Sequence, residues 1–266
     1  MESRELLIYL AVLFKGNWDK IYEALQVREE YETQEQQAKK CIANLKSKAI
    51  TFLDDEYPES LKRVTKPPFA LFYHGDISLL KSENILAVVG TRHPSEYGTK
   101  YTTSFVKQLC KDFVIVSGCA LGIDATAHRA CIKNQGKTIA VLGCGINVCY
   151  LKSNLDIYEE CKKNHLVISE YPDSTIPEPT NFPIRNRIIV ALADVLFVPE
   201  GKNNSGTQIS TWLMAQKNGN VCALPERIDV DSVCNSLIAE GAYLVQSPRD
   251  IYEVAGVTPK RPIFEK

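Results

Sequence analysis

The sequence lacks several features that would place it in a common class of protein. Its formal net charge is −1, so any contact with nucleic acid must come from a local basic patch. No apolar run reaches the length of a membrane-spanning helix, and the first residues lack the basic and apolar regions of a signal peptide. These absences predict a soluble, cytoplasmic protein with no membrane contact.

Paired cysteines and nucleotide-binding fingerprints are missing as well. The nine cysteines include no CxxC pair, and the four histidines show no metal-site spacing, so we expect reduced thiols and no metal. Gly143-Cys144-Gly145 follows an apolar run, but Val148 stands where the dinucleotide fingerprint requires a third glycine. No GxxxxGK[ST] loop occurs either. We therefore expect no cofactor.

The hydrophobic pattern divides the chain into four parts. Residues 1–50 carry apolar residues at helical spacing and predict a small helical domain. Residues 51–84 are rich in turn signals and predict a connector, in which residues 69–73 could form a short strand. Residues 85–256 predict the main domain, and residues 257–266 predict a loose tail.

Six short apolar runs alternate with helical patterns in the main domain. Runs without polar alternation are typical of strands that are buried on both faces of a parallel sheet. The repeated order of strand and helix predicts an α/β fold, an extended Rossmann-like, doubly wound, mostly parallel sheet. The runs are Ile85–Val89, Phe113–Val116, Thr138–Leu142, Leu166–Ile168, Val195–Val198 and Val221–Leu224.

A polar loop that contains glycine follows each of three runs. These loops are Gly90–Gly98, Ser117–Asp124 and Ser205–Thr207. Glycine lets the backbone approach an anion, and free N–H groups at a helix start point toward it. An ordinary helix cap also explains Ser and Gly in one such loop. Three loops at the carboxyl ends of parallel strands predict one shared anion-binding rim.

A helix that starts near Arg185 and Arg187 is unusual because two cations at a helix amino terminus oppose the macrodipole. If they face the rim, they supply charge for phosphates, and Phe182 offers a stacking surface for a base. The other interpretation is an internal salt bridge with Glu170 or Glu200. The sequence leaves both open.

One set of motifs runs in the same order as in a known family. The motifs are Gly90-x-Arg92-x-x-Ser95-x-Tyr97-Gly98, Ser117-Gly118-x-Ala120-x-Gly122-Ile123-Asp124, Tyr150 with Asn154, Ser169-Glu-Tyr-Pro172, Phe182-Pro183-x-Arg185-Asn186-Arg187, Glu200, Ser205-Gly206-Thr207 and Leu237-Ile238-x-x-Gly241-Ala242. Together they resemble the DNA-processing protein A family, also called Smf, over roughly residues 55–255.

The resemblance implies an extended Rossmann domain that binds single-stranded DNA and hands it to the RecA recombinase during natural transformation. It also implies a homodimer, which we expect to form near Leu237–Val254, and no catalytic residues. The expected DNA-binding residues are Gly90, Arg92, Ser95, Ser117, Gly118, Asp124, Tyr150, Asn154, Phe182, Arg185, Asn186, Arg187, Lys202, Ser205, Gly206 and Thr207.

Three positions depart from the family pattern. The family usually has a basic residue at Leu121, proline at Leu151 and glycine at Glu226. The first and third departures reduce local positive charge, which predicts weaker DNA binding if both face the rim. The alternative function is a nucleotide sensor or a phosphoribohydrolase-like enzyme. The loop of that enzyme family resembles Gly206-Thr207, but Ser210 stands where it carries a catalytic Glu.

Overall fold

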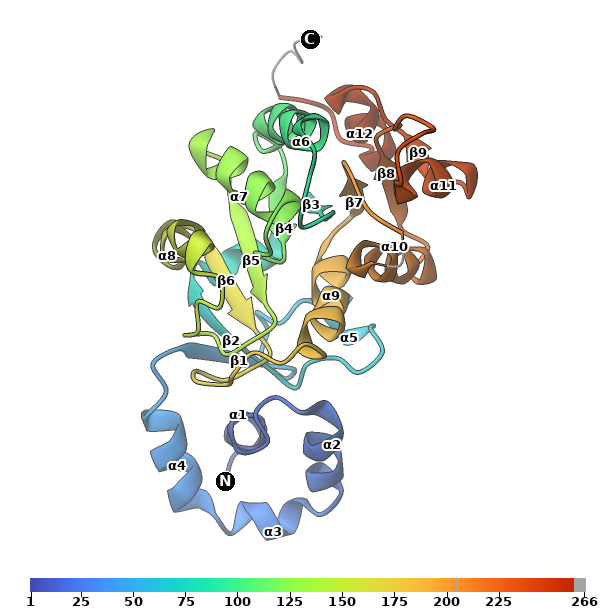
Figure 1. The fold of residues 1–266 in the computed structure, drawn as a ribbon. Helices are drawn as coiled ribbons and strands as arrows, with labels where there is room; N and C mark the ends of the chain where they lie inside the picture. Colours follow the sequence, from blue (N-terminus) through green and yellow to red (C-terminus); the bar gives the residue numbers. More distant parts are fainter. Residues whose placement is uncertain (204, 261–266) are drawn as a thin grey trace.

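The computed structural model describes residues 1–203 and 205–260 of the chain (Figure 1). The strands are β1 Lys48–Thr51, β2 Ala70–Gly75, β3 Ile85–Val88, β4 Val114–Ser117, β5 Thr138–Leu142, β6 Leu166–Ser169, β7 Val195–Val198, β8 Asn220–Ala223 and β9 Tyr243–Leu244. They form one nine-stranded sheet in the order β1-β2-β6-β5-β4-β3-β7-β8-β9. Every neighbouring pair from β6 to β9 is parallel, which confirms the predicted fold class.

Helices surround this sheet. They are α1 Ser3–Leu13, α2 Trp18–Gln26, α3 Arg28–Glu32, α4 Glu35–Ala43, α5 Glu59–Lys62, α6 Glu96–Leu109, α7 Ile123–Lys133, α8 Leu155–Asn164, α9 Asn181–Leu192, α10 Gly206–Gln216, α11 Val233–Ala239 and α12 Pro248–Ala255. None of the helices described here is both long enough and apolar enough to cross a membrane.

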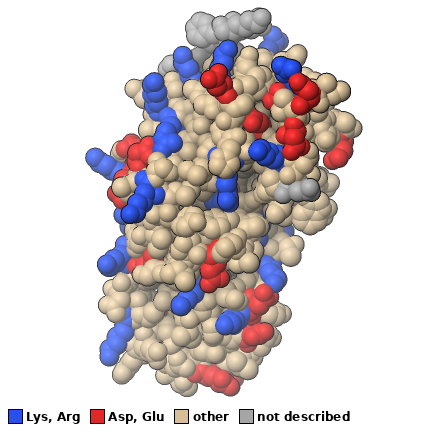
Figure 2. Space-filling model, in the orientation of Figure 1, with Lys and Arg blue, Asp and Glu red and all other residues tan. Residues whose placement is uncertain are grey.

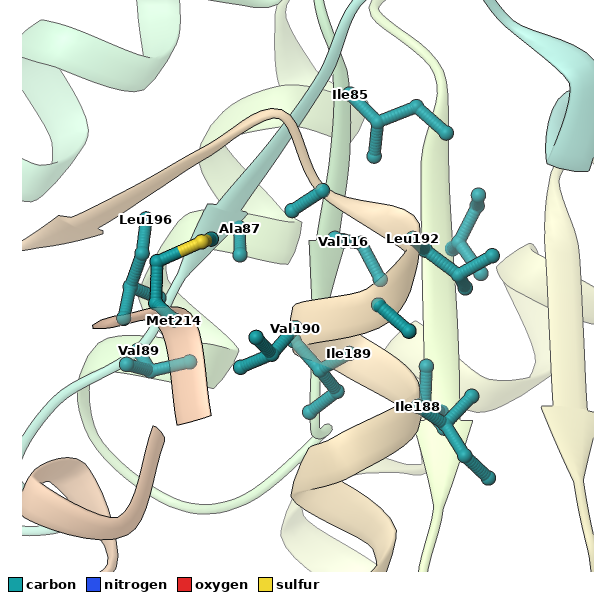
Figure 3. Close-up of a cluster of buried hydrophobic side chains, with 14 of the residues drawn as sticks. Ile85, Ala87, Val89, Val116, Ile188, Ile189, Val190, Leu192, Leu196 and Met214 are labelled. Atoms are coloured by element: carbon teal, nitrogen blue, oxygen red, sulfur yellow. The ribbon is translucent and has the colours of Figure 1, made fainter. Parts of the chain in front are cut away.

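The strands of the main domain are buried on both faces because each face is covered by its own helices. In β3, Ile85 and Ala87 pack into one core cluster, which also contains the buried side of α9, whereas Leu86 and Val88 pack into a second cluster with α6 and α7. Figure 3 shows the first cluster, with α9 lying across the sheet. This double burial explains why these runs lack polar alternation.

The sheet starts earlier in the chain than the sequence pattern indicated. β2 pairs antiparallel with β6, and β1 pairs antiparallel with β2. The possible strand at residues 69–73 is therefore present, and part of the predicted connector belongs to the sheet. β1 was not predicted because its residues, Lys-Ala-Ile-Thr, begin and end with polar side chains and form no apolar run. Figure 1 shows α1 to α4 together at the end of the molecule beside β1 and β2.

The order of the central strands positions the predicted rim. β4, β3 and β7 are neighbours, and the three glycine-containing loops follow them. From β3 the chain winds outward through β4, β5 and β6 on one side, and then through β7, β8 and β9 on the other. The order reverses between β3 and β7, which is where open α/β sheets bind ligands.

Candidate functional site

The three predicted loops contact one another at the carboxyl end of the sheet. The backbone N–H of Thr91 in the first loop donates to the carbonyl of Glu200, which precedes the third loop, at 2.9 Å. The N–H of Ile123 in the second loop donates to the carbonyl of Thr91 at 3.1 Å. The first loop therefore lies between the other two, and the rim is continuous.

The amide groups of the first loop already bind an internal anion. The Glu200 carboxylate accepts hydrogen bonds from the Ser95 backbone N–H at 3.1 Å and from the Ser95 hydroxyl at 2.7 Å. A Cβ atom at Gly98 would lie 2.1 Å from Glu200 Oε2, so only glycine leaves room for this carboxylate. Ser95 also caps α6, because its hydroxyl accepts from the Gly98 N–H. The Glu200 carboxylate thus lies at the amino terminus of α6.

The second loop is arranged around a buried carboxylate in a similar way. Asp124 accepts from the backbone N–H of Gly118 at 3.1 Å and of Ala120 at 3.4 Å. Burial raises the pKa of Asp124, whereas the positive charge of Arg185 and the two N–H donors act in the opposite direction. These donors point inward and stabilise the loop itself.

Two further predicted residues also hold the second loop in place. Ser117 is fully buried, and its hydroxyl donates to the Val88 carbonyl at 2.6 Å. Asn154 is 2% exposed, and its amide donates to the carbonyls of Cys119 at 3.0 Å and Ala120 at 3.1 Å. The predicted residues Ser117 and Asn154 thus position the loop and point away from solvent.

The third loop differs because its helix end is open. Ser205 caps α10, its hydroxyl accepting from the Thr207 N–H at 3.3 Å and donating to the Lys202 carbonyl at 2.6 Å. Gly206 is exposed, and a Cβ there would meet nothing closer than Asn186 Nδ2 at 3.8 Å. No carboxylate of residues 1–203 and 205–260 accepts a hydrogen bond from this loop. Lys202 is exposed beside it.

A cavity of about 380 Å³ lies next to the second loop. Arg92 and Leu121 line it from the first two loops, Tyr150 lines it from the segment after β5, and Phe182 and Arg185 line it from α9. The rings of Tyr150 and Phe182 lie 5.5 Å apart between centroids and are tilted by 40°. Figure 2 shows Lys and Arg side chains in the middle of the visible face, near α9. It shows others along the left edge of the molecule, over α7 and α8. The cavity therefore combines an aromatic pair with two cations.

Arg185 forms the inner wall of the cavity. Only 5% of it is exposed, and its Nη1 donates to the carbonyls of Gly118, at 2.6 Å, and Val141. Burial lowers the pKa of Arg185, and the Asp124 carboxylate opposes this effect. A Cβ at Gly118 would lie 2.4 Å from Nη2, so this glycine makes room for the guanidinium. Asn186 accepts from Arg185 Nε at 3.2 Å.

Arg187 has a different environment, although it is only two residues away. Its Nη2 donates to both carboxylate oxygens of Glu170, at 2.6 and 2.8 Å, and its Nε donates to the Lys66 carbonyl at 3.0 Å. The side chains of Arg187 and Glu170 are 10% and 5% exposed. The internal salt bridge that the sequence left open is therefore formed by Arg187, and this residue does not line the cavity.

The positions that depart from the family pattern are not equivalent. Leu121 and Leu151 line the cavity. Glu226 does not; its carboxylate accepts from the Arg227 backbone N–H at 2.9 Å and raises the pKa of Tyr97, which burial raises more strongly. Of the two departures that reduce positive charge, only the one at Leu121 faces the cavity.

The internal carboxylates are what the sequence reasoning missed at this site. The motifs included Glu200, and Asp124 was expected to bind DNA, but neither carboxylate was predicted to accept hydrogen bonds from a loop of the protein itself. The sequence did contain one signal. The motifs include an acidic residue, Glu200, together with a glycine of a different loop, Gly98, and these two residues lie next to each other in the structure. That pairing becomes visible only when the loops are placed in space.

Comparisons with known proteins identify the family to which the chain belongs. A family model described as DNA recombination-mediator protein A matches residues 48–256. The chain belongs to this family. The resemblance found in the sequence motifs is thereby confirmed.

Two curated members of the family are similar over most of this chain. The DNA processing protein DprA of Streptococcus pneumoniae is 40% identical over 205 residues, which cover 76% of this chain and 72% of that protein. The DNA processing protein DprA of Bacillus subtilis is 37% identical over 208 residues, which cover 77% of this chain and 70% of that protein.

Two solved structures of family members share the fold. The X-ray structure of DNA processing protein A from S. pneumoniae has a TM-score of 0.80 at 34% identity and covers 94% of this chain and 92% of its own. A structure concerning the single-stranded DNA binding mode of DNA processing protein A from Helicobacter pylori has a TM-score of 0.72 at 28% identity. It covers 79% of this chain and 95% of its own.

Proposed function

We propose that this protein binds single-stranded DNA along the rim formed by the carboxyl ends of β5, β4, β3 and β7. The observation that carries the proposal is the cavity of about 380 Å³, lined by Arg92, Arg185 and the aromatic pair Tyr150 and Phe182. A nucleotide needs both a stacking surface and positive charge, and this cavity supplies both. The structure of DNA processing protein A from H. pylori, which concerns the binding of single-stranded DNA, supports the proposal.

The phosphates of the strand would bind at two places on the rim. One is the amino terminus of α10, where Ser205, Gly206 and Thr207 present an open helix end next to Lys202. The other is Arg92, which is exposed and makes no ion pair with the residues described. Because phosphate contacts and stacking carry little base identity, the binding would tolerate most sequences.

We also propose that the protein acts as a homodimer and passes its DNA to a RecA-type recombinase in the cytoplasm, during recombination or natural transformation. Family membership supports this proposal, and the exposed edge strand β9 supports the dimer. Tyr243 and Leu244 on this strand are 49% and 48% exposed. Exposed apolar side chains side by side at a sheet edge are suited to burial against a second copy. Light scattering of the wild type and of Leu244→Lys tests the proposed dimer. We expect a dimeric wild type and a weakened dimer in Leu244→Lys, and a monomeric wild type would refute the proposal.

The alternative function is recognition or hydrolysis of a small nucleotide. Ser210, at the position where the phosphoribohydrolases carry Glu, is buried, and its hydroxyl donates to the Gly206 carbonyl at 3.3 Å. A buried hydroxyl at this position provides no general acid or base. The cavity nevertheless would accept a mononucleotide, so this alternative is tested directly.

The test is a fluorescence anisotropy titration of a labelled dT oligomer at two salt concentrations, with AMP and a cyclic nucleotide as competitors. We expect binding that weakens with salt, and Arg92→Ala should lower the salt slope by roughly 0.7. Lys107→Ala is the matched control, since Lys107 is exposed in the last turn of α6, away from the rim. Tight AMP binding without oligomer binding would favour the alternative function.

A further inference from the structure

Two cysteines outside the rim lie side by side where α6 and α7 end. Cys110 directly follows α6, and Cys131 lies in the last turn of α7. A Cβ atom added at Gly136 would lie 2.6 Å from Cys110 Cβ and 2.7 Å from Cys131 Sγ. Both side chains thus contact the same point, so they are immediate neighbours. All nine cysteines are free thiols in this structure.

Gly136 leaves the space that brings the two side chains together. The φ angle of Gly136 is not positive, so the backbone conformation at this position does not itself require glycine. A side chain there would overlap Cys110 and Cys131 and push them apart. The packing of the two cysteines is therefore the structural reason for glycine at this position.

We propose that Cys110 and Cys131 form a disulfide when the protein meets a peroxide. In the first step the Cys110 thiolate attacks one peroxide oxygen; an S–O bond forms, the O–O bond breaks, and the sulfur becomes a sulfenic acid. Hydroxide leaves and takes up the proton that the thiol released, which gives the first water. The Cys131 thiol then attacks that sulfur, an S–S bond forms, the S–O bond breaks, and water leaves. Two thiols and one hydrogen peroxide thus give one disulfide and two waters.

The environments of the two thiols assign the order of these steps. A hydrogen bond with Cys131 lowers the pKa of Cys110; burial acts against it, and the neighbouring Lys111 ammonium lowers it further. Cys110 directly follows α6 and is 5% exposed, whereas Cys131 lies in the last turn of α7 and is fully buried. A small oxidant therefore reaches Cys110 first. Cys131 then serves as the resolving thiol.

The disulfide would join α6 to α7 at the ends that lie away from the rim. α6 and α7 begin next to the first and second loops, and both cysteines are at the opposite ends. A cross-link between residues 110 and 131 closes a short loop and restricts the unfolded chain. Oxidation should therefore raise Tm by about 5 °C.

The experiment treats the folded full-length chain with hydrogen peroxide, blocks free thiols, and digests it with trypsin. We expect the peptides Gln108–Lys111 and Ala130–Lys133 to be linked, and the link to vanish on reduction. In Cys131→Ser the reaction should stop at the sulfenic acid of Cys110, which dimedone traps. Cys161→Ser is the matched control, because Cys161 is also buried and lies near Cys131, so its loss should leave the cross-link unchanged.

Three results would overturn the proposal. One is that both thiols remain free at peroxide concentrations that oxidise an exposed thiol on a reference protein. Another is a link from Cys131 to Cys161, seen in the wild type and lost in Cys161→Ser. The last is a cross-link between residues 110 and 131 that forms only in urea, since this would mean that the folded arrangement does not direct it.

Discussion

The first and third loops of the rim share a sequence pattern but differ in what binds their amide groups. At the start of α6, the Glu200 carboxylate accepts hydrogen bonds from Ser95. At the start of α10, Gly206 is exposed and no described carboxylate binds the loop. The second loop resembles the first, because Asp124 accepts from Gly118.

The difference shows how little a glycine-containing turn before a helix indicates by itself. The backbone N–H groups of such a turn need acceptors, and a side chain of the protein can provide them as well as a ligand can. In two of the three loops the protein provides a carboxylate, so these loops stabilise the fold. In the third loop no carboxylate of the described residues accepts a hydrogen bond, and four substitutions test this distinction.

The largest effect should come from removing the carboxylate of the second loop. Asp124→Ala removes the negative charge that opposes the effect of burial on Arg185 and leaves two loop N–H groups without an acceptor, so we expect the free energy of unfolding to fall by about 3–5 kcal/mol in a urea titration. Asp156→Ala is the control, since its ion pair with Arg129 is exposed and should contribute below about 1 kcal/mol. Equal losses in both variants would mean that the second loop does not depend on its carboxylate.

The next effect concerns the open loop, which Gly206→Asp should convert to a filled one. The new side chain has space, and an acid is favourable at a helix start, so stability should be unchanged or slightly higher. DNA affinity should fall by about 1–3 kcal/mol because the carboxylate replaces a phosphate. Fluorescence anisotropy of a labelled DNA oligomer measures the affinity, with Gly206→Asn as the neutral control. Unchanged affinity in Gly206→Asp would exclude this helix end from the DNA path.

A smaller gain is expected at the cavity from Leu121→Arg. Leu121 lines the cavity, so an arginine there adds a cation near the strand and should strengthen binding by about 1 kcal/mol with a steeper salt dependence. Glu226→Gly should act in the same direction but less, since Glu226 does not line the cavity. Leu121→Met controls for shape. A larger gain from Glu226→Gly would place the DNA near β8 rather than at the cavity.

The smallest effect should come from Glu200→Gln at the first loop. The change removes one negative charge from the rim but keeps an oxygen for Ser95, so DNA binding should strengthen by about 0.5 kcal/mol through weaker repulsion. Glu96→Gln is the control, because Glu96 is an exposed acid one residue from Ser95. A gain of more than about 2 kcal/mol would show instead that DNA displaces Glu200 from the loop.

The fold could be predicted to the extent that it depends on local pattern. The run Ile85–Val89 has apolar residues at every position because both faces of β3 are covered, and this signal survives in the sequence. Lys48–Thr51 gives no such signal, because β1 is an edge strand of four residues. Its place in the sheet depends on pairing with β2, which no local pattern records.

The candidate site could be predicted as a set of residues but not as a set of roles. Arg185 and Arg187 look equivalent in the sequence, and both were expected at the rim. On α9 they are two residues apart, so they point about 200° apart around the helix. Arg185 therefore lines the cavity, whereas Arg187 pairs with Glu170.

The hydrophobic runs, the glycine-containing loops and the family could be identified from the sequence alone, because these features depend on residues that are close together in the chain. Which loop holds no internal carboxylate, and which arginine faces the cavity, became known only from the three-dimensional arrangement. These outcomes depend on single side chains from distant segments, such as Glu200 beside Ser95, and their contacts form only when the sheet brings neighbouring strands together.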